Sequence, residues 1–401
     1  WLKLSTIISC GTIAAAVILG LTKVFTSSKS KHVAEVVSAS REGGASARLV
    51  RFFRALFGWM PGGIAVMVAA VCALFTTFTG GSGVTIIALG GLVYPILRDD
   101  GYPEGFSLGL VTAAGSLGLL FPPSLPVILY SVVASVPADS LYLAGLVPGL
   151  LLVVLTAAWG IRQGLRLEAQ GRKRPEFVLR ELGVSFWEAK WELALPFLVI
   201  VLFASGFASM VEASAAACAY AAIVECLVTR DIHPFRQLPG VLLKAGALMG
   251  AVLLLLSVAM GLTSWLVDAQ VPGALLAYVK THVSSPLAFL LVLNVILLVL
   301  GSVLEIYSAI VILAPLVAPM GAAFGIDPIH LGVIFLANLE LGFLFPPVGL
   351  NLFLSSSRFG VPLPKLYRHA VPFLLILGAG VLLITYVPAM SVGLLSLLGR
   401  R

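Results

Sequence analysis

Long apolar runs make up most of the chain, and short polar connections separate them. Residues 55–97 and 105–138 hold no Asp, Glu, Lys or Arg, and further apolar runs of about one membrane span follow them. A transmembrane helix needs about 20 predominantly apolar residues. The pattern therefore predicts an all-α polytopic membrane protein with about ten to twelve membrane-embedded helical segments.

Residues that break helices interrupt the two longest runs. Residues 79–83 read Thr-Gly-Gly-Ser-Gly, and residues 121–126 read Phe-Pro-Pro-Ser-Leu-Pro. Proline lacks a backbone N–H and blocks the preceding turn, and glycine loosens the chain. In hydrocarbon, the backbone groups left free are tolerated only where they line a cavity or are covered by protein. These breaks therefore predict helical hairpins and discontinuous helices.

Two halves of the chain resemble each other at an offset of 224 residues. Between 82–131 and 306–355, 14 of 50 aligned residues are identical, whereas shared apolar composition alone would give about five. In this alignment the Phe-Pro-Pro motif that begins at Phe121 falls on the motif that begins at Phe345. The chain is therefore predicted to contain an internal repeat.

Each copy of the repeat carries two breaks, at 79–83 and 118–126 in the first copy and at 301–308 and 342–351 in the second. Broken apolar segments at matching positions of two halves indicate the binding site of a secondary transporter. Duplicated kinked helices with a purely structural role are the alternative.

The breaks offer chemistry that suits ions. Unwound carbonyls and hydroxyls form a set of hard oxygen ligands for an alkali cation, and half-helix N-termini suit a carboxylate. Side-chain oxygens near the breaks come from Thr79, Ser82, Ser116 and Ser124 in the first copy, and from Ser302, Ser308, Asn338 and Asn351 in the second. Two cation sites beside one anion site predict cation-coupled uptake of an organic acid.

Two carboxylates, Glu305 and Glu340, lie inside the second copy. A carboxylate within a membrane span costs several kcal/mol unless it is neutral, paired or hydrated. Ion coupling and a structural hydrogen bond to a broken helix are equally good interpretations of each.

Composition narrows the classes of protein further. The chain of 401 residues is 60% hydrophobic and 11% charged, with a mean hydropathy of +1.08, which excludes a soluble enzyme and a disordered chain. The net charge of +7 is explained by Lys and Arg in cytoplasmic loops rather than by nucleic-acid binding. The polar connection 162–190 is basic and is predicted to be cytoplasmic, and its second half has the pattern of an interfacial amphipathic helix.

The residues around the breaks resemble the large membrane (M, or DctM-type) subunit of the tripartite ATP-independent periplasmic (TRAP) transporters. The stretches that carry the resemblance are 75–85, 101–103, 115–126, 325–328 and 338–353. The resemblance implies two inverted repeats, each with a re-entrant helical hairpin and a broken helix, and transport and scaffold domains that work as an elevator. It also implies a sodium-coupled importer of an organic acid in the bacterial inner membrane. Its partners would be a small membrane subunit (Q, or DctQ-type), a periplasmic substrate-binding protein (P, or DctP-type) and membrane lipid.

The resemblance also implies sites, with Na⁺ as coupling ion, no covalent cofactor and no catalytic residue. Sodium site 1 would use Thr79, Ser82, Gly118, Phe121 and Pro122, and sodium site 2 would use Gly301, Gly342, Phe345 and Val348. Residues expected beside the substrate are Ser116, Ser124, Glu305, Asn338, Glu340 and Asn351. Many members have Thr where this chain has Phe345, so a carbonyl ligand survives there and a hydroxyl ligand does not.

The expected organisation follows from these motifs. It comprises an N-terminal helix and interfacial arm (1–54), a first transport repeat (55–161, hairpin 59–98, broken helix 105–136), a cytoplasmic amphipathic connection (162–192), scaffold or arm helices (193–280), a second transport repeat (281–358, hairpin 285–323, broken helix 328–357) and a C-terminal helix (359–401). Two other functions stay open. One is an ion-coupled anion symporter or antiporter that needs no binding protein, and the other is a non-transporting membrane scaffold or intramembrane enzyme.

Overall fold

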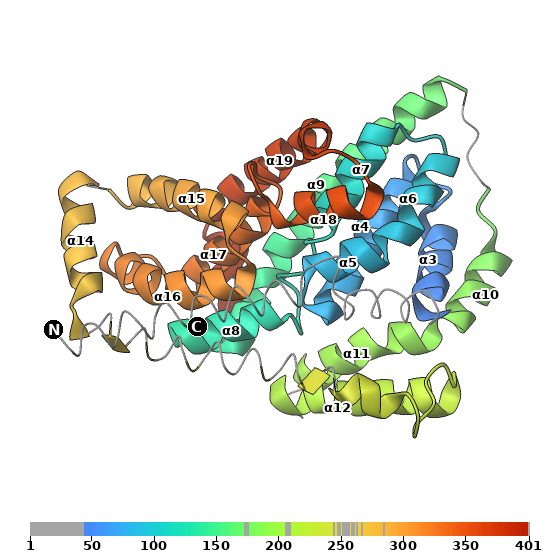
Figure 1. Ribbon diagram of the computed structural model, residues 1–401, viewed down its shortest axis with the longest axis horizontal. Helices are drawn as coiled ribbons and strands as arrows, with labels where there is room; N and C mark the ends of the chain where they lie inside the picture. Colours follow the sequence, from blue (N-terminus) through green and yellow to red (C-terminus); the bar gives the residue numbers. More distant parts are fainter. Residues whose placement is uncertain are drawn as a thin grey trace.

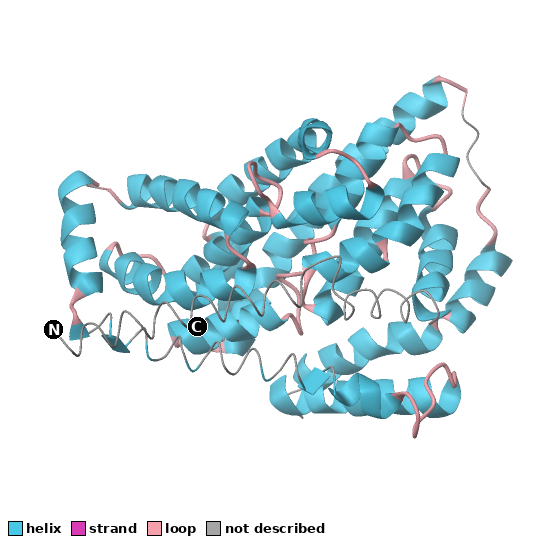
Figure 2. Cartoon of the chain, viewed as in Figure 1, coloured by secondary structure: helices cyan, strands magenta, loops and turns pink. Residues whose placement is uncertain are grey.

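The computed structural model describes residues 44–171, 176–204, 210–243 and 268–399 except 284, with isolated residues between 245 and 265. The expected N-terminal helix within residues 1–43 lies outside the described residues. Figure 2 shows that regular structure in the described part of the chain is helical, with short connecting loops.

The two sequence repeats fold into the same series of helices (Figure 1). The first copy contains α4 (Gly63–Thr79), α5 (Ser82–Ala88), α6 (Gly90–Asp99), α7 (Glu104–Ala114), α8 (Leu125–Ala134) and α9 (Ala138–Ala169). The second contains α15 (Pro286–Val303), α16 (Ile306–Ala323), α17 (Pro328–Gly342), α18 (Leu350–Phe359) and α19 (Leu363–Tyr386). The pair α5–α6 corresponds to the single helix α16, so each copy consists of a hairpin, a broken helix and a long helix.

Helices end where the sequence pattern predicts breaks. Gly80 ends α4 with a left-handed φ of 64°, a conformation that glycine adopts without steric cost. In the second copy the turn from α15 to α16 consists of Leu304 and Glu305, which are both extended. The longer breaks, at 115–124 and 343–349, both contain a cis Pro-Pro peptide bond.

The two copies exchange partners across the molecule. Helix α8 of the first copy packs on α16 of the second, and α18 of the second copy packs on α5 of the first. One apolar core runs through both copies and includes Ile64, Val68, Leu117, Ile310 and Phe335. Each broken helix is therefore supported by the hairpin of the other copy.

A group of amphipathic and apolar helices lies beside the first copy, and we call it the arm: α3 (Gly44–Phe57), α10 (Leu179–Glu188), α11 (Lys190–Ala204), α12 (Met210–Ile223) and the π-helix η1 (Val224–Val228). Ion pairs connect it. Arg48 lies 2.5 Å from Glu192 and 3.2 Å from Asp231, and Arg51 lies 2.8 Å from Glu188. At the opposite end of the molecule, α14 (Val271–His282) contacts α16 (Figure 1).

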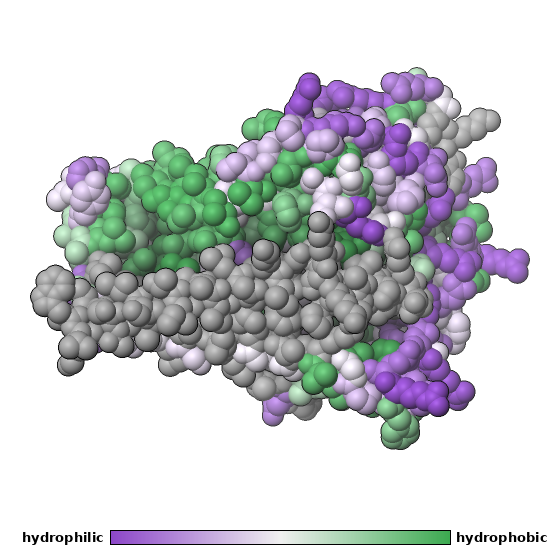
Figure 3. Space-filling view, in the orientation of Figure 1, coloured by the Kyte–Doolittle hydropathy of each residue, from purple (hydrophilic) through white to green (hydrophobic). Residues whose placement is uncertain are grey.

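Four described helices, α9, α15, α16 and α19, are long and apolar enough to cross a membrane. Four shorter apolar helices accompany them in the described part of the chain: Gly63–Thr79, Leu125–Ala134, Ala215–Val228 and Pro328–Gly342. Figure 3 shows a wide hydrophobic surface over α15 and α16. Exposed apolar side chains on α15, including Leu287, Leu291 and Val303, contribute to it, as expected of a face that meets lipid tails.

The helices differ from the expected organisation at two places. Helix α9 continues past residue 161 through Arg162 and Arg166 to Ala169, because cationic side chains are favourable near the C-terminal end of a helix. The C-terminal segment 359–401 forms two helices, α19 and α20 (Ala389–Leu397), rather than one. The chain leaves the helical conformation at Val387, since a residue that precedes a proline disfavours it.

Candidate functional site

Buried threonine hydroxyls hold the end of α4 against the first break. Thr76 Oγ1 lies 2.8 Å from the carbonyl oxygen of Gly115. Thr77 Oγ1 lies 2.8 Å from the Ala73 carbonyl oxygen and 3.2 Å from the Gly118 carbonyl oxygen. Thr76 Oγ1 also lies 2.7 Å from Thr85 Oγ1 of α5. The first hairpin and the first break therefore form one hydrogen-bonded unit.

Gly118 lies where the break and α4 approach most closely. A Cβ atom at this position would lie 2.1 Å from the carbonyl oxygen of Ala73 and 2.6 Å from the amide nitrogen of Thr77. The Gly118 carbonyl also accepts a hydrogen bond from the Phe121 amide at 3.2 Å. Because a carbonyl oxygen has two lone pairs, the Gly118 carbonyl could bind a cation while it accepts from Phe121, with the single Thr77 hydroxyl proton donated to the Ala73 carbonyl at 2.8 Å.

The tip of the first hairpin, residues 79–82, contacts both copies. Tyr307 of α16 donates its hydroxyl proton to the Gly80 carbonyl at 2.8 Å. A Cβ atom on Gly80 would lie 3.3 Å from Leu125 Cβ, at the start of α8. Thr79 Oγ1 makes only long contacts, 3.4 and 3.5 Å from the carbonyls of Thr76 and Gly81. The structure thus brings Thr79 and Gly80 to the N-terminus of α8.

The second break repeats this arrangement. Gly301 and Gly342 pack backbone to backbone, since a Cβ atom on Gly342 would lie 2.7 Å from the carbonyl carbon of Gly301. The Phe345 amide donates to the Gly342 carbonyl at 2.9 Å, which is the counterpart of the bond between Phe121 and Gly118. The Gly349 amide donates to the Ser302 carbonyl at 2.8 Å. Here too the break is bound directly to the hairpin tip.

Glu305 caps the N-terminus of α16. Its carboxylate accepts hydrogen bonds from the amides of Tyr307 at 3.0 Å and Ser308 at 3.5 Å. These are two of the amides that a helix start leaves without a partner inside the helix. The contacts agree with the structural interpretation of Glu305.

Three of the residues expected beside the substrate have polar atoms that no group in the described residues satisfies. They are Ser124 (Oγ), Glu340 (both carboxylate oxygens) and Asn351 (Oδ1). All three side chains are buried, at 0%, 2% and 0% exposure. Ser124 is the N-cap of α8 and Asn351 lies in the first turn of α18, so two of the three occupy the starts of matching half-helices.

The other residues of this group have partners. Asn338 donates to Asn294 Oδ1 at 2.5 Å. Thr385 Oγ1 lies 3.1 Å from the same oxygen and 2.8 Å from the Val381 carbonyl oxygen. Ser116 Oγ donates weakly to the Ala113 carbonyl at 3.4 Å. These contacts join α15, α17 and α19 in a buried polar network, which supports a packing role for Asn338.

The remaining residues assigned to the two sodium sites differ in burial. Ser82 is buried at the start of α5, and Phe121 and Pro122 are half-buried. The Phe121 ring packs against α9, since a Cβ atom on Gly149 would lie 2.9 Å from Phe121 Cζ. Phe345 is half-buried, and Val348 is 44% exposed. A sodium-binding role for any of these residues stays a prediction.

Sequence reasoning missed three tyrosines that bind the breaks. Tyr142 of α9 donates to the Ser124 carbonyl at 2.7 Å, and Tyr367 of α19 donates to the Pro347 carbonyl. The third is Tyr307, described above. Tyr142 and Tyr367 lie within one residue of the same repeat position. Alignment of the two halves of the sequence could therefore have identified this pair of tyrosines.

Comparisons with known proteins agree with this architecture. Residues 36–390 match the family described as tripartite ATP-independent periplasmic transporter, DctM component. The C4-dicarboxylate TRAP transporter large permease protein DctM of Pseudomonas aeruginosa is 37% identical over 359 residues, which are 89% of this chain and 83% of the relative. The isethionate TRAP transporter permease protein DctMQ of Oleidesulfovibrio alaskensis is 33% identical over 86% of this chain and 54% of that longer protein.

A solved structure supports the fold independently. The crystal structure of the YdaH transporter of Alcanivorax borkumensis superposes with a TM-score of 0.56 and 18% identity, over 88% of this chain and 87% of that one. Together with the family match and the apolar spanning helices, the comparisons establish what kind of protein this is. The chain is a multi-pass inner-membrane protein that belongs to the DctM family, the large permease component of TRAP transporters, and it is a transport protein rather than an enzyme.

Proposed function

We propose that this chain is the transporting subunit of a sodium-coupled importer that carries a small organic anion. The observation that carries the proposal is the pairing of Ser124 and Asn351. Both are buried, both have an unsatisfied polar atom, and both stand at the start of a half-helix, one in each copy. Half-helix N-termini near the middle of the bilayer are the part of secondary transporters that faces anionic substrate groups.

The donor set at the breaks supports sodium as the coupling ion. The groups near Thr79, Ser82 and Gly118, and near Gly301 and Gly342, are hydroxyl and carbonyl oxygens, which suit a hard alkali cation. A bound cation would supply positive charge beside the substrate anion. The Tyr307 hydroxyl, which donates to the Gly80 carbonyl at the hairpin tip, would turn away to admit the cation. The Thr77 hydroxyl can keep its bond to the Ala73 carbonyl.

The proposed substrate is a small organic anion, with C4-dicarboxylates as the first candidates. The Pseudomonas aeruginosa relative is named for C4-dicarboxylates and the Oleidesulfovibrio alaskensis relative for isethionate, and both names denote small acidic molecules. The buried residues of the described core include no Lys or Arg. Helix N-termini, hydroxyl groups and the coupling cation would therefore balance the negative charge of the anion in this part of the site.

The proposed complex contains two partners, a periplasmic substrate-binding protein and a small membrane subunit. The family description calls the transporter tripartite and periplasmic. The relative named DctMQ is a longer chain, of which this chain covers 54%, so the small subunit is proposed either as a separate chain or as a fused part.

Elevator movement is the proposed route of access. One apolar core includes residues of both copies, and each hairpin packs on the broken helix of the other. Two repeats that share a core in this way are suited to move together against the arm rather than to rock apart.

Uptake into proteoliposomes tests the proposal. The purified permease, with its small subunit, is reconstituted and supplied with labelled succinate, a purified periplasmic binding protein and an inward sodium gradient. We expect uptake that needs both the gradient and the binding protein. Uptake without the binding protein would favour the symporter or antiporter alternative, and failure to transport any of a panel of organic anions would favour a scaffold.

A further inference from the structure

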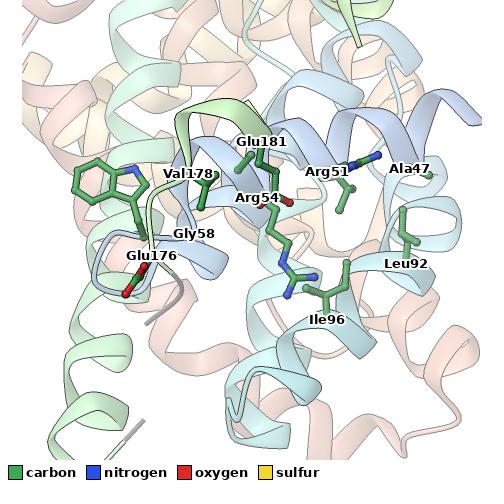
Figure 4. A pocket seen from close by; sticks show the side chains of 12 residues that line it. Ala47, Arg51, Arg54, Gly58, Leu92, Ile96, Glu176, Val178 and Glu181 are labelled. Carbon is green, nitrogen blue, oxygen red and sulfur yellow. The ribbon is translucent and has the colours of Figure 1, made fainter. Parts of the chain in front are cut away.

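A cavity of about 570 Å³ lies between the arm and the first hairpin, outside the transport site (Figure 4). Helix α3 lines one side of it, with Arg51 and Arg54, and α6 lines another with Leu92 and Ile96. The segment that leads into α10, together with α10 itself, closes it with Glu176, Val178 and Glu181. The cavity therefore has an apolar wall and a charged wall.

Some of the charged side chains that line this cavity have no ion-pair partner. Arg51 is paired with Glu188, with both carboxylate oxygens within 3.0 Å of Nη1. Across the described ranges, no ion pair involves Arg54, Glu176 or Glu181. Figure 4 shows the Arg54 side chain extending toward Ile96 of the apolar wall. One cation and two anions are thus free to meet a ligand.

The surroundings place the cavity at the level of lipid headgroups. Helix α3 has charged residues on one face and Phe53 and Phe57 on the other, and Trp59, which is 45% exposed, contacts Phe177 edge to face at 5.7 Å. Amphipathic basic helices and tryptophans concentrate at the interface between hydrocarbon and water. The basic segment that begins at Arg162 places this end of the molecule on the cytoplasmic side.

We propose that this cavity binds the headgroup of phosphatidylethanolamine from the cytoplasmic leaflet. The Arg54 guanidinium would take the lipid phosphate, because arginine suits phosphate oxygens. Glu181 or Glu176 would take the ammonium group, and the acyl chains would run along Leu92 and Ile96. Phosphatidylglycerol has the phosphate but no ammonium, so both carboxylates would repel it. The cavity thus distinguishes a zwitterionic lipid from an anionic one.

Such a lipid would lie between the arm and α6 of the first hairpin. The lipid would fill the space between the arm and α6, and it would not fix the arm to the hairpin. This proposal concerns lipid binding alone, and it holds whether or not the transport proposal does.

Native mass spectrometry of the full chain in mild detergent, titrated with the two lipids, tests the inference. The variants are Arg54→Gln and Glu181→Gln, and the control is Arg180→Gln, an exposed arginine of α10 outside the cavity lining. We expect the wild type and the control to retain phosphatidylethanolamine. Loss of one charge-assisted hydrogen bond should lower retention in either variant about tenfold. Because the substituted side chains are exposed, the variants should keep the wild-type melting temperature.

Three results would overturn the inference. Equal retention of both lipids would show that the carboxylates do not select the headgroup, and retention unchanged in Arg54→Gln would show that the phosphate lies elsewhere. The third uses the permease with its small subunit and a photo-reactive side chain at Ile96. Crosslinks to that subunit in place of lipid would show that a protein segment fills the cavity.

Discussion

At the scale of single residues, the breaks depend on glycines that allow two backbones to touch. We predict that Gly118→Ala lowers sodium-dependent uptake at least about tenfold, because overpacking by one methyl group costs about 1–3 kcal/mol and would separate α4 from the first break. Gly342→Ala should act in the same way on the second break. The control is Gly378→Ala in α19, where a Cβ atom would meet only an ordinary 3.7 Å contact with Leu341. Normal uptake by Gly118→Ala would contradict the predicted role of this contact.

Glu340 poses a different question at the same scale, because its buried carboxylate has no hydrogen-bond partner among the described residues. An unsatisfied polar group in the interior destabilises a fold. We therefore predict that Glu340→Leu raises the melting temperature in detergent and abolishes uptake, as expected where function opposes stability. Glu340→Gln keeps the shape of the side chain and should lose uptake with little change in melting temperature. Normal transport by the Glu340→Gln variant would show that Glu340 takes no part in ion coupling.

At the scale of elements, variants of Glu305 distinguish a helix-capping role from a role in ion coupling. The capping interpretation predicts that Glu305→Gln keeps most of the uptake, since the amide oxygen still accepts from the Tyr307 and Ser308 amides. Glu305→Ala should lower the stability of the protein by about 1 kcal/mol, the usual cost of a lost N-cap. The measurements are sodium-dependent uptake and thermal unfolding of both variants. Complete loss of uptake in a stable Glu305→Gln protein would show that the charge itself is needed.

The sequence predicts elements where local chemistry decides the structure. Gly80 and the two Pro-Pro motifs break helices through their own backbone properties, so the positions of the breaks follow from the pattern. Helix α9 extends to Ala169, beyond the apolar run that ends at Ile161, because charge in the sequence does not distinguish the last turns of a helix from a loop. The turn at Val387 was missed for the opposite reason, since a single proline in an apolar run also occurs inside helices, as Pro372 does in α19.

Contacts between distant elements could not be predicted in the same way. Nothing local to Tyr307 indicates that its hydroxyl binds Gly80, because that bond depends on how the two copies cross. The same holds for Asn351, which donates to the Thr112 carbonyl at 3.1 Å. The cavity beside Arg54 is built from three segments that the sequence does not place together. The sequence therefore indicates which residues belong to the candidate site, but it does not indicate which distant residues they contact.

At the scale of the whole molecule, the crossing of the two copies distinguishes two ways of alternating access. Secondary transporters work by rocking one repeat against the other, or by moving parts of the molecule as rigid bodies around the site. Thr112 Oγ1 of α7 and Ser355 Oγ of α18 are buried 2.8 Å apart and belong to different copies. A crosslink at this point would block a rocking movement and would leave a joint movement of both copies unaffected.

We therefore predict that a disulfide formed in the double variant Thr112→Cys and Ser355→Cys leaves sodium-driven uptake close to the reduced level. The four native cysteines, of which Cys218 is exposed, are first replaced by Ala, so that the membrane-permeable oxidant can form only the intended bond, and mass spectrometry confirms the linkage. Each single cysteine variant, oxidised in the same way, serves as the control, because it can form no crosslink between the copies. Since the proposed elevator carries both copies together, the crosslinked protein should still alternate. Loss of uptake on oxidation that a reductant restores would show instead that the copies move against each other.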